Sequence, residues 1–139
     1  MFNRILHAND GSEPAFRALA LALAIAEQNR SEFHIVCVEE IPYLPEFVEE
    51  VRESVGVAAR YFHGVLQRAR EMAGRSRVEL HAHVLAGHPV RDIVELAAEL
   101  EADLLVIGAT GHSAFYERMI GSRADRIMQL ARCPVLVVK

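Results

Sequence analysis

The sequence predicts an α/β fold: a single domain with an open, mainly parallel five-stranded sheet and helices on both faces. Short apolar runs typical of buried strands alternate with longer runs of helical spacing along the whole chain. The length of 139 residues is that of one domain, and no linker, low-complexity tract or internal repeat interrupts the alternation. We therefore expect residues 1–139 to form one domain.

The first half of the chain contains two expected strands, each followed by a helical pattern. Apolar residues at positions 15, 18, 19, 22, 23 and 26 have the spacing of one helix face. Gly56 and Gly64 interrupt the second helical pattern and weigh against one straight helix there. The expected elements are a strand from Arg4 to Asn9, a helix from Pro14 to Gln28, a strand from Phe33 to Val38, and helical residues from Phe47 to Met72.

The second half contains three expected strands and two helices. A strand from Val78 to Leu85 alternates more than the others, so we expect it at an edge of the sheet. The run from Leu104 to Ile107 is continuously apolar, which is typical of a parallel strand buried on both faces. The remaining elements are a helix that begins near Pro89, a helix from Arg123 to Arg132, and a strand from Pro134 to Val138.

Composition excludes several classes of function. A net charge of −4 and a pI of about 6.0 argue against nucleic acid as a partner, because its binders usually carry a basic face. No apolar run reaches the roughly 18 residues that a membrane span needs, so we expect no membrane insertion. Cys37 and Cys133 both sit in apolar surroundings, which indicates buried reduced thiols and a cytoplasmic protein.

The main chemical signal is a set of glycines after the fourth expected strand. Gly108 and Gly111 are followed, nine residues later, by Gly121 and Ser122 at the start of the last helix. Backbone N–H groups can gather around a phosphate at such a loop, and the helix dipole favours an anion there. The loop lacks the Gly-Lys-Ser/Thr ending of a P-loop, so a P-loop mechanism is not expected.

This loop also has an explanation that needs no ligand. Ser122 and Asp125 fit a capping box, in which Ser122 caps the last helix and Asp125 reaches back to it. Both interpretations can hold together, because a capping hydroxyl can also face a phosphate. His112 lies inside the loop, where its backbone or ring could meet phosphate, and Arg123 could neutralise phosphate charge.

Asp10 directly follows the first expected strand. A turn and a helix cap account for Gly11, Ser12 and Pro14, but they account less well for an Asp at position 10. A carboxylate at that point can accept a hydrogen bond from a ribose hydroxyl or an adenine amine, or can hold a metal ion. If the first and fourth strands are neighbours at the centre of the sheet, Asp10 and the loop from Gly108 to Gly111 open onto one crevice. His81 and His83 share a strand face, but no further His or Cys cluster accompanies them as zinc would require.

Several motifs together resemble the universal stress protein family over essentially the whole chain. They are Ile5-Leu-His-Ala-Asn-Asp-Gly-Ser-Glu13, Gly87-His-Pro89, Asp103-Leu-Leu-Val-Ile-Gly-Ala-Thr-Gly-His-Ser113, Gly121-Ser122 and Cys133-Pro-Val-Leu-Val-Val138. The Gly-x2-Gly-x9-Gly-Ser spacing is similar to that of the family's ATP-binding branch. The chain departs from the family at His7 and Asn9, where aliphatic residues are usual.

The resemblance implies an ATP-binding protein, with AMP or ADP as other possible ligands and Mg²⁺ or Mn²⁺ as the cation. It implies a sensor or regulator of the stress response, and a homodimer formed through Pro134 to Val138, a strand that would otherwise leave an apolar edge exposed. The sequence names neither the stress nor a regulatory protein partner. By resemblance Gly108, Gly111, Gly121 and Ser122 hold the phosphates, His112 and Arg123 line them, Asp10 sits near ribose and adenine, and the backbone around Val38 meets the adenine edge.

Two other functions remain open at this point. The chain could be a slow ATPase or phosphotransferase that uses Asp10, although no residue of the loop is an obvious general base for water. It could also be a stress scaffold that binds no nucleotide and acts through its dimer surface. We expect no catalytic residues, and the sequence does not identify a metal ligand.

Overall fold

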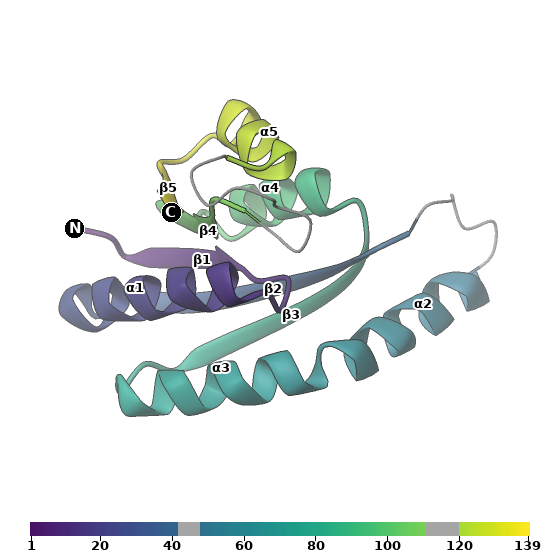
Figure 1. Ribbon diagram of the computed structural model, residues 1–139, viewed down its shortest axis with the longest axis horizontal. Coiled ribbons are helices and arrows are strands. Elements are labelled where there is room, and N and C mark those ends of the chain that lie inside the picture. The colour runs from purple at the N-terminus through teal and green to yellow at the C-terminus, as the bar shows by residue number, and fades with distance from the viewer. Residues whose placement is uncertain (42–47, 111–119) are drawn as a thin grey trace.

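The computed structural model describes residues 1–41, 48–110 and 120–139 (Figure 1). Along the chain the elements are β1 (Arg4–Ala8), α1 (Glu13–Asn29), β2 (Glu32–Glu40), α2 (Val48–Tyr61), α3 (His63–Arg75), β3 (Leu80–Gly87), α4 (Pro89–Glu99), β4 (Leu104–Gly108), α5 (Ser122–Leu130) and β5 (Val135–Val138). The predicted α/β architecture is confirmed, and most element boundaries agree within a few residues.

The strands form one parallel sheet in the order β3-β2-β1-β4-β5. From β1 the chain moves outward through β2 to β3, then returns to place β4 on the other side of β1. The strand order therefore reverses between β1 and β4, where Leu6 is in register with Leu105. This confirms the expectation that the first and fourth strands are central neighbours and that β3 lies at an edge. A parallel sheet binds its ligands beyond the carboxyl ends of its strands at such a reversal.

Helices cover both faces of the sheet, and each face has its own core (Figure 1). On one face α1 and α3 pack on Phe33 of β2 and Val106 of β4. On the other face α4 and α5 pack through Ile93 and Ile127 on Leu105 of β4. Alternate residues of β4 thus enter different cores, which explains why this strand reads as a continuous apolar run.

The long helical pattern in the middle of the chain forms two helices, α2 and α3, that meet at Phe62. Neither Gly56 nor Gly64 marks the junction. Phe62 is 2% exposed and packs with Ala58 and Cys37 in a small core of its own. Its amide still donates to the Ala58 carbonyl at 2.9 Å, so the hydrogen bonds continue across the bend. Burial of Phe62 therefore accounts for the junction better than glycine flexibility does.

Helix α1 begins at a side-chain cap. The Ser12 hydroxyl accepts a hydrogen bond from the Ala15 amide at 3.3 Å, and Pro14 occupies the first turn. Ser12→Ala is expected to lower the free energy of unfolding by about 1 kcal/mol, because it leaves that amide without its acceptor. Chemical denaturation would measure the loss. Ser54→Ala within α2 is the matched control, and an equal loss there would contradict the capping role.

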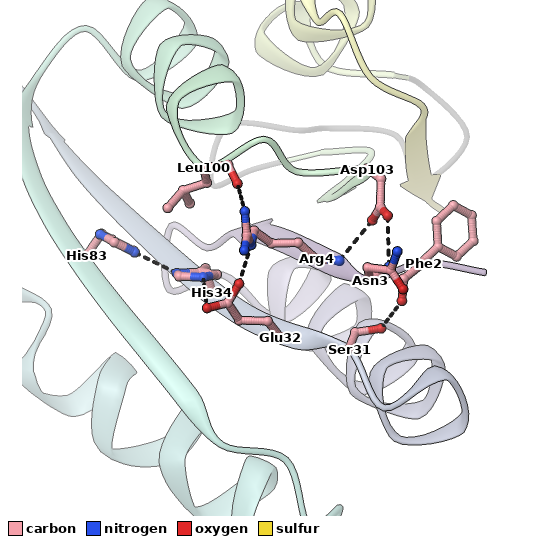
Figure 2. A network of polar contacts seen from close by, with 9 residues as sticks. All are labelled: Phe2, Asn3, Arg4, Ser31, Glu32, His34, His83, Leu100 and Asp103. Atoms are coloured by element: carbon pink, nitrogen blue, oxygen red, sulfur yellow. Dashed lines mark hydrogen bonds and ion pairs between the residues drawn. The ribbon is translucent and has the colours of Figure 1, made fainter.

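A polar network joins the chain start to the amino ends of β2 and β4 (Figure 2). Asp103 accepts from the amides of Asn3 and Arg4 at 2.8 and 3.0 Å, and the Arg4 guanidinium pairs with Glu32. Nearby, His34 Nδ1 lies 2.9 Å from His83 Nε2, and the His34 ring stacks on His81. Register between β2 and β3 brings His34 to the two histidines that the sequence had singled out.

Two structural findings bear on metals and membranes within the described ranges. No group of three His, Cys, Asp or Glu side chains among these residues could hold a metal ion. None of the described helices is both long and apolar enough to cross a membrane.

Candidate functional site

A cavity of about 580 Å³ lies beyond the carboxyl ends of β1, β2 and β4, where the strand order reverses. Its volume is within the range of small-molecule sites. Its walls come from both strand ends and helix starts: Ala8, Asn9, Asp10, Ala15, Val36, Val38, Glu39, Glu40, Tyr61, Phe62, Pro89, Ile93, Ile107, Gly108, Ala109, Thr110, Gly121, Ser122, Arg123, Ala124 and Ile127.

Asp10 lies on the turn between β1 and α1. Its carboxylate accepts from the Ser12 amide at 3.0 Å and from the Ser12 hydroxyl at 2.5 Å. Gly11 between them has a φ of +86°, and a Cβ there would lie 3.1 Å from Val65, so the turn suits glycine. These contacts hold the Asp10 carboxylate in one orientation at the cavity wall.

Gly108 ends β4 on the opposite side of the same crevice. A Cβ at Gly108 would lie 3.3 Å from the carbonyl oxygen of Pro14, in the first turn of α1. The end of β4 therefore packs directly on the backbone of α1. A Cβ at this distance would be tighter than most contacts, so the approach favours glycine here before any ligand is considered.

Gly121 precedes α5, whose first turn faces the cavity. Its amide donates to the Ala109 carbonyl at 2.6 Å, and its own carbonyl accepts from Asp125 at 3.0 Å. Gly121 has extended φ and ψ and is the N-cap, with no side-chain cap. The expected capping box is therefore wrong: Ser122 is the first helical residue, and its hydroxyl does not cap the helix. The capping role that had explained Ser122 without a ligand is thereby removed.

Arg123 reaches across the cavity mouth to the end of β2. Its Nη2 lies 2.6 Å from Glu40 Oε2, and the two side chains are 56% and 57% exposed. This ion pair joins the start of α5 to the end of the strand that carries Val38. Both partners also border a second hollow beside α4 and α5.

Six of the eight predicted site residues line this one cavity: Asp10, Val38, Gly108, Gly121, Ser122 and Arg123. They come from four separate segments that only the sheet topology unites. The other two, Gly111 and His112, lie outside the described residues.

Sequence reasoning missed several cavity residues. Tyr61 and Phe62 reach the site because α2 and α3 meet beside it, and no motif marks that junction. Glu40 belongs to no motif either, yet it forms the ion pair with Arg123. Pro89 and Ile93 of α4 also line the wall, and the sequence predicted no site role for either, although Pro89 belongs to the Gly87-His-Pro89 motif.

The two cysteines differ in burial. Cys37 is buried, and this burial raises the pKa of its thiol to about 12. Cys133 is only partly buried, so the expectation of two buried thiols holds for Cys37 alone. Both are free thiols.

Comparisons with known proteins point to one family. A family model described as the universal stress protein family matches residues 1–139. The chain is 32% identical to universal stress protein YxiE of Bacillus subtilis over 151 residues, covering all of both chains. It is 33% identical over 147 residues to a universal stress protein of Methanocaldococcus jannaschii, covering all of this chain and 83% of that one.

Solved structures agree with the fold. Universal stress protein UspA from Lactobacillus plantarum superposes with a TM-score of 0.82 at 26% identity, over 99% of this chain and 97% of that one. A universal stress protein in complex with cAMP has a TM-score of 0.77 at 24% identity, over 99% and 97% of the two chains. One from Archaeoglobus fulgidus in complex with dAMP has a TM-score of 0.65 at 24% identity, over 99% and 98%.

Proposed function

Because the chain belongs to the universal stress protein family, we propose that it binds an adenine nucleotide in the cavity at the reversal of strand order. The proposed ligand is ATP, with AMP or ADP as related ligands and Mg²⁺ or Mn²⁺ as the accompanying cation. In this proposal the chain is a nucleotide-dependent sensor or regulator, which acts by binding the nucleotide reversibly and not by catalysing its turnover.

One observation carries the proposal. The cavity places the start of α5, with Gly121 and Ser122, beside the end of β4 at Gly108, and sets Asp10 on a third side. A helix start offers unsatisfied N–H groups to phosphate, while a carboxylate offers an acceptor to hydroxyl or amine groups. A ligand that has phosphate at one end and a nucleoside at the other matches both features. The family relatives solved with cAMP and dAMP have such ligands.

The proposed roles follow these positions. Gly108, Gly121 and Ser122 hold the phosphates together with Gly111, and Arg123 and His112 line them. Asp10 accepts from the ribose or adenine, and the backbone around Val38 meets the adenine edge. Oxygen ligands suit Mg²⁺, which is usually held by substrate phosphates and one or two carboxylates. Asp10 is the carboxylate of the cavity wall that we propose for such a role.

The contacts of Asp10 favour binding over catalysis. Its carboxylate accepts two hydrogen bonds from Ser12, an arrangement that fixes it as an acceptor. The alternative of a slow ATPase or phosphotransferase makes a different prediction: phosphate should appear when the protein is incubated with ATP. Binding of ATP and of a non-hydrolysable analogue with equal affinity, and no phosphate release over hours, would exclude the enzyme.

The direct test of the proposal is to denature the purified protein and identify any nucleotide released. Chromatography of the supernatant would separate AMP, ADP and ATP, and titration calorimetry on the stripped protein would give the affinity of each. Recovery of an adenine nucleotide, or saturable binding of one, supports the proposal. If neither is seen, the alternative of a scaffold that binds no nucleotide is the better account.

The proposal extends to assembly and location. β5 lies at an edge of the sheet and its residues are only partly buried, so a second copy could pair with it. We propose a homodimer through Pro134 to Val138, in the cytoplasm, where free thiols such as Cys37 and Cys133 persist. Sedimentation equilibrium would measure the mass in solution, and a monomer at all concentrations would exclude the dimer.

Glu40→Gln is expected to tighten ATP binding about two- to five-fold, because the Glu40 carboxylate competes with phosphate for Arg123. The binding of adenosine, which has no phosphate, should not change. Glu39→Gln is the matched control, since Glu39 also lines the cavity but is not the partner of Arg123. Calorimetric titration of both variants measures the effect, and equal tightening by both would show a general charge effect instead.

A further inference from the structure

We propose that His7 and Asn9 are positioning residues of the cavity. Their hydrogen bonds tie the Asp10 turn to β4 and thereby hold Asp10 in place to bind the ribose or adenine of the ligand. The inference rests on the proposed function and deepens it. It concerns two buried polar residues, one in β1 and one in the turn that follows it.

Both side chains are polar groups inside the sheet core. His7 is fully buried and Asn9 is 3% exposed. His7 Nδ1 lies 3.0 Å from the Val106 carbonyl oxygen, and His7 Nε2 lies 3.1 Å from Asn9 Nδ2. Asn9 Oδ1 in turn accepts from the Gly11 amide at 2.8 Å. Three hydrogen bonds thus run in series from β4, through β1, to the turn that carries Asp10.

The series can run in only one direction. A carbonyl oxygen accepts and never donates, so His7 Nδ1 must carry the hydrogen that points to Val106. A neutral imidazole then has a bare Nε2, which accepts from the Asn9 amide nitrogen. Asn9 is left with its oxygen facing the Gly11 N–H. The tautomer of His7 therefore sets the orientation of the Asn9 amide, and that orientation fixes the turn.

The series connects two walls of the cavity. Val106 lies two residues before Gly108, and Asn9 lies beside Asp10 and itself lines the cavity. Within the turn, Asn9 and Asp10 each accept from the amide two residues further on. Without an acceptor at position 7, the Asn9 amide nitrogen would be buried without a partner, so the side chain would turn toward water in the cavity and release the Gly11 N–H. Asp10 would then lose its fixed position.

The phosphate side of the cavity is held by other bonds. The Gly121 amide donates to the Ala109 carbonyl at 2.6 Å, and the Ala109 amide donates to the Val138 carbonyl at 2.9 Å. Neither bond involves His7 or Asn9. Loss of the series should therefore weaken the recognition of ribose and adenine and leave the recognition of phosphate unchanged.

The test compares three variants with three ligands by titration calorimetry. His7→Leu removes the series, and His7→Gln retains it, because a Gln amide offers an oxygen to Asn9 and an N–H to Val106. His34→Gln is the matched control: His34 is also a buried histidine of a central strand, but it does not line the cavity. The ligands are ATP, adenosine and inorganic tripolyphosphate.

His7→Leu is expected to weaken ATP and adenosine about ten-fold each and to leave tripolyphosphate unchanged. His7→Gln should regain most of the affinity, and His34→Gln should match the unaltered chain. A partly unfolded variant would lose all three ligands in equal proportion, and that pattern, or undiminished adenosine binding, would overturn the inference. Failure of the unaltered chain to bind any nucleotide would overturn the proposed function, and this inference with it.

A second measurement does not depend on any ligand. The ¹⁵N chemical shifts of the imidazole in the free protein identify the protonated nitrogen of His7. Hydrogen on Nδ1, together with a Gly11 amide that is protected from exchange and loses protection in His7→Leu, supports the series. Hydrogen on Nε2 would overturn it even if nucleotide binds normally.

Discussion

Gly121→Val is expected to weaken ATP binding by at least about 100-fold while the protein stays folded. Phosphate can reach the first amides of α5 only if nothing projects from the residue that precedes the helix. A loss of that size corresponds to about 2.7 kcal/mol, which is reasonable for blocking several charge-assisted hydrogen bonds at once.

The fold should tolerate the change. Gly121 has a φ of −64° and a ψ of 157°, a conformation open to any residue. A Cβ there would lie 3.4 Å from the Ala109 carbonyl oxygen and 3.7 Å from Thr110 Cα, which are ordinary contacts. The added valine methyl groups would lie between the start of α5 and the residues after β4. That is the space in which the proposed phosphates sit, so the cost falls on binding.

Calorimetric titration with ATP measures the affinity, and thermal unfolding measures the stability. Gly74→Val near the end of α3 is the control, because a Cβ there meets nothing within 4 Å and neither Gly74 nor its sequence neighbours line the cavity. Unchanged ATP affinity in Gly121→Val would mean that the glycine loop is not the binding site. A large fall in melting temperature would mean that the glycine serves the fold instead.

The contrast with Gly108 separates what sequence can and cannot assign. Both glycines belong to one motif, and the motif alone suggests one role for both. In the structure, a Cβ at Gly108 would lie 3.3 Å from the Pro14 carbonyl oxygen of α1, whereas a Cβ at Gly121 would lie 3.4 Å from the Ala109 carbonyl oxygen, so the two glycines face different backbone segments. A spacing pattern records that glycine is present, but the reason depends on which backbone lies opposite, and that is decided by packing between distant segments.

The sheet itself followed from local signals. Apolar runs and helical spacing are properties of neighbouring residues, and the right-handed crossover rule leaves few ways to arrange them. The reversal between β1 and β4 then brought Asp10 and Gly108 to one crevice, as expected. Contacts between remote side chains could not be foreseen in this way. Glu40 and Arg123 are 83 positions apart, and His34 joins His83 only through strand register.

Helix starts show the limit at the scale of single residues. Ser12 caps α1 as its sequence indicates, yet Ser122 does not cap α5, because Gly121 already has the extended conformation of an N-cap. Ser12 is the N-cap of its helix, whereas Ser122 lies one position later, as the first residue of its helix. Sequence patterns place a helix start only within about two to four residues, which is too coarse to say which group faces a ligand.

Acidification from pH 6.5 to pH 4 is expected to cost the protein about 3 kcal/mol of stability through His7 alone. Burial lowers the pKa of His7 from 6.5 to about 4 in the folded chain. Between these values the unfolded chain binds the proton and the folded chain does not, so stability falls as pH falls. The contribution is complete above pH 6.5, and each unit of difference is worth about 1.4 kcal/mol.

His7→Leu isolates this effect, because leucine cannot bind a proton. Burial also lowers the pKa values of His34 and His83, so their acid dependence has the same sign and remains in the variant. Urea denaturation at a series of pH values should therefore give a shallower dependence of stability on pH for His7→Leu than for the unaltered chain between pH 4 and 6.5. Parallel curves would contradict a neutral, buried His7.

Protonation would also turn His7 Nε2 into a donor that faces the Asn9 amide nitrogen, which is itself a donor. The adenosine affinity of the unaltered chain should therefore fall over the same pH range in which its stability falls.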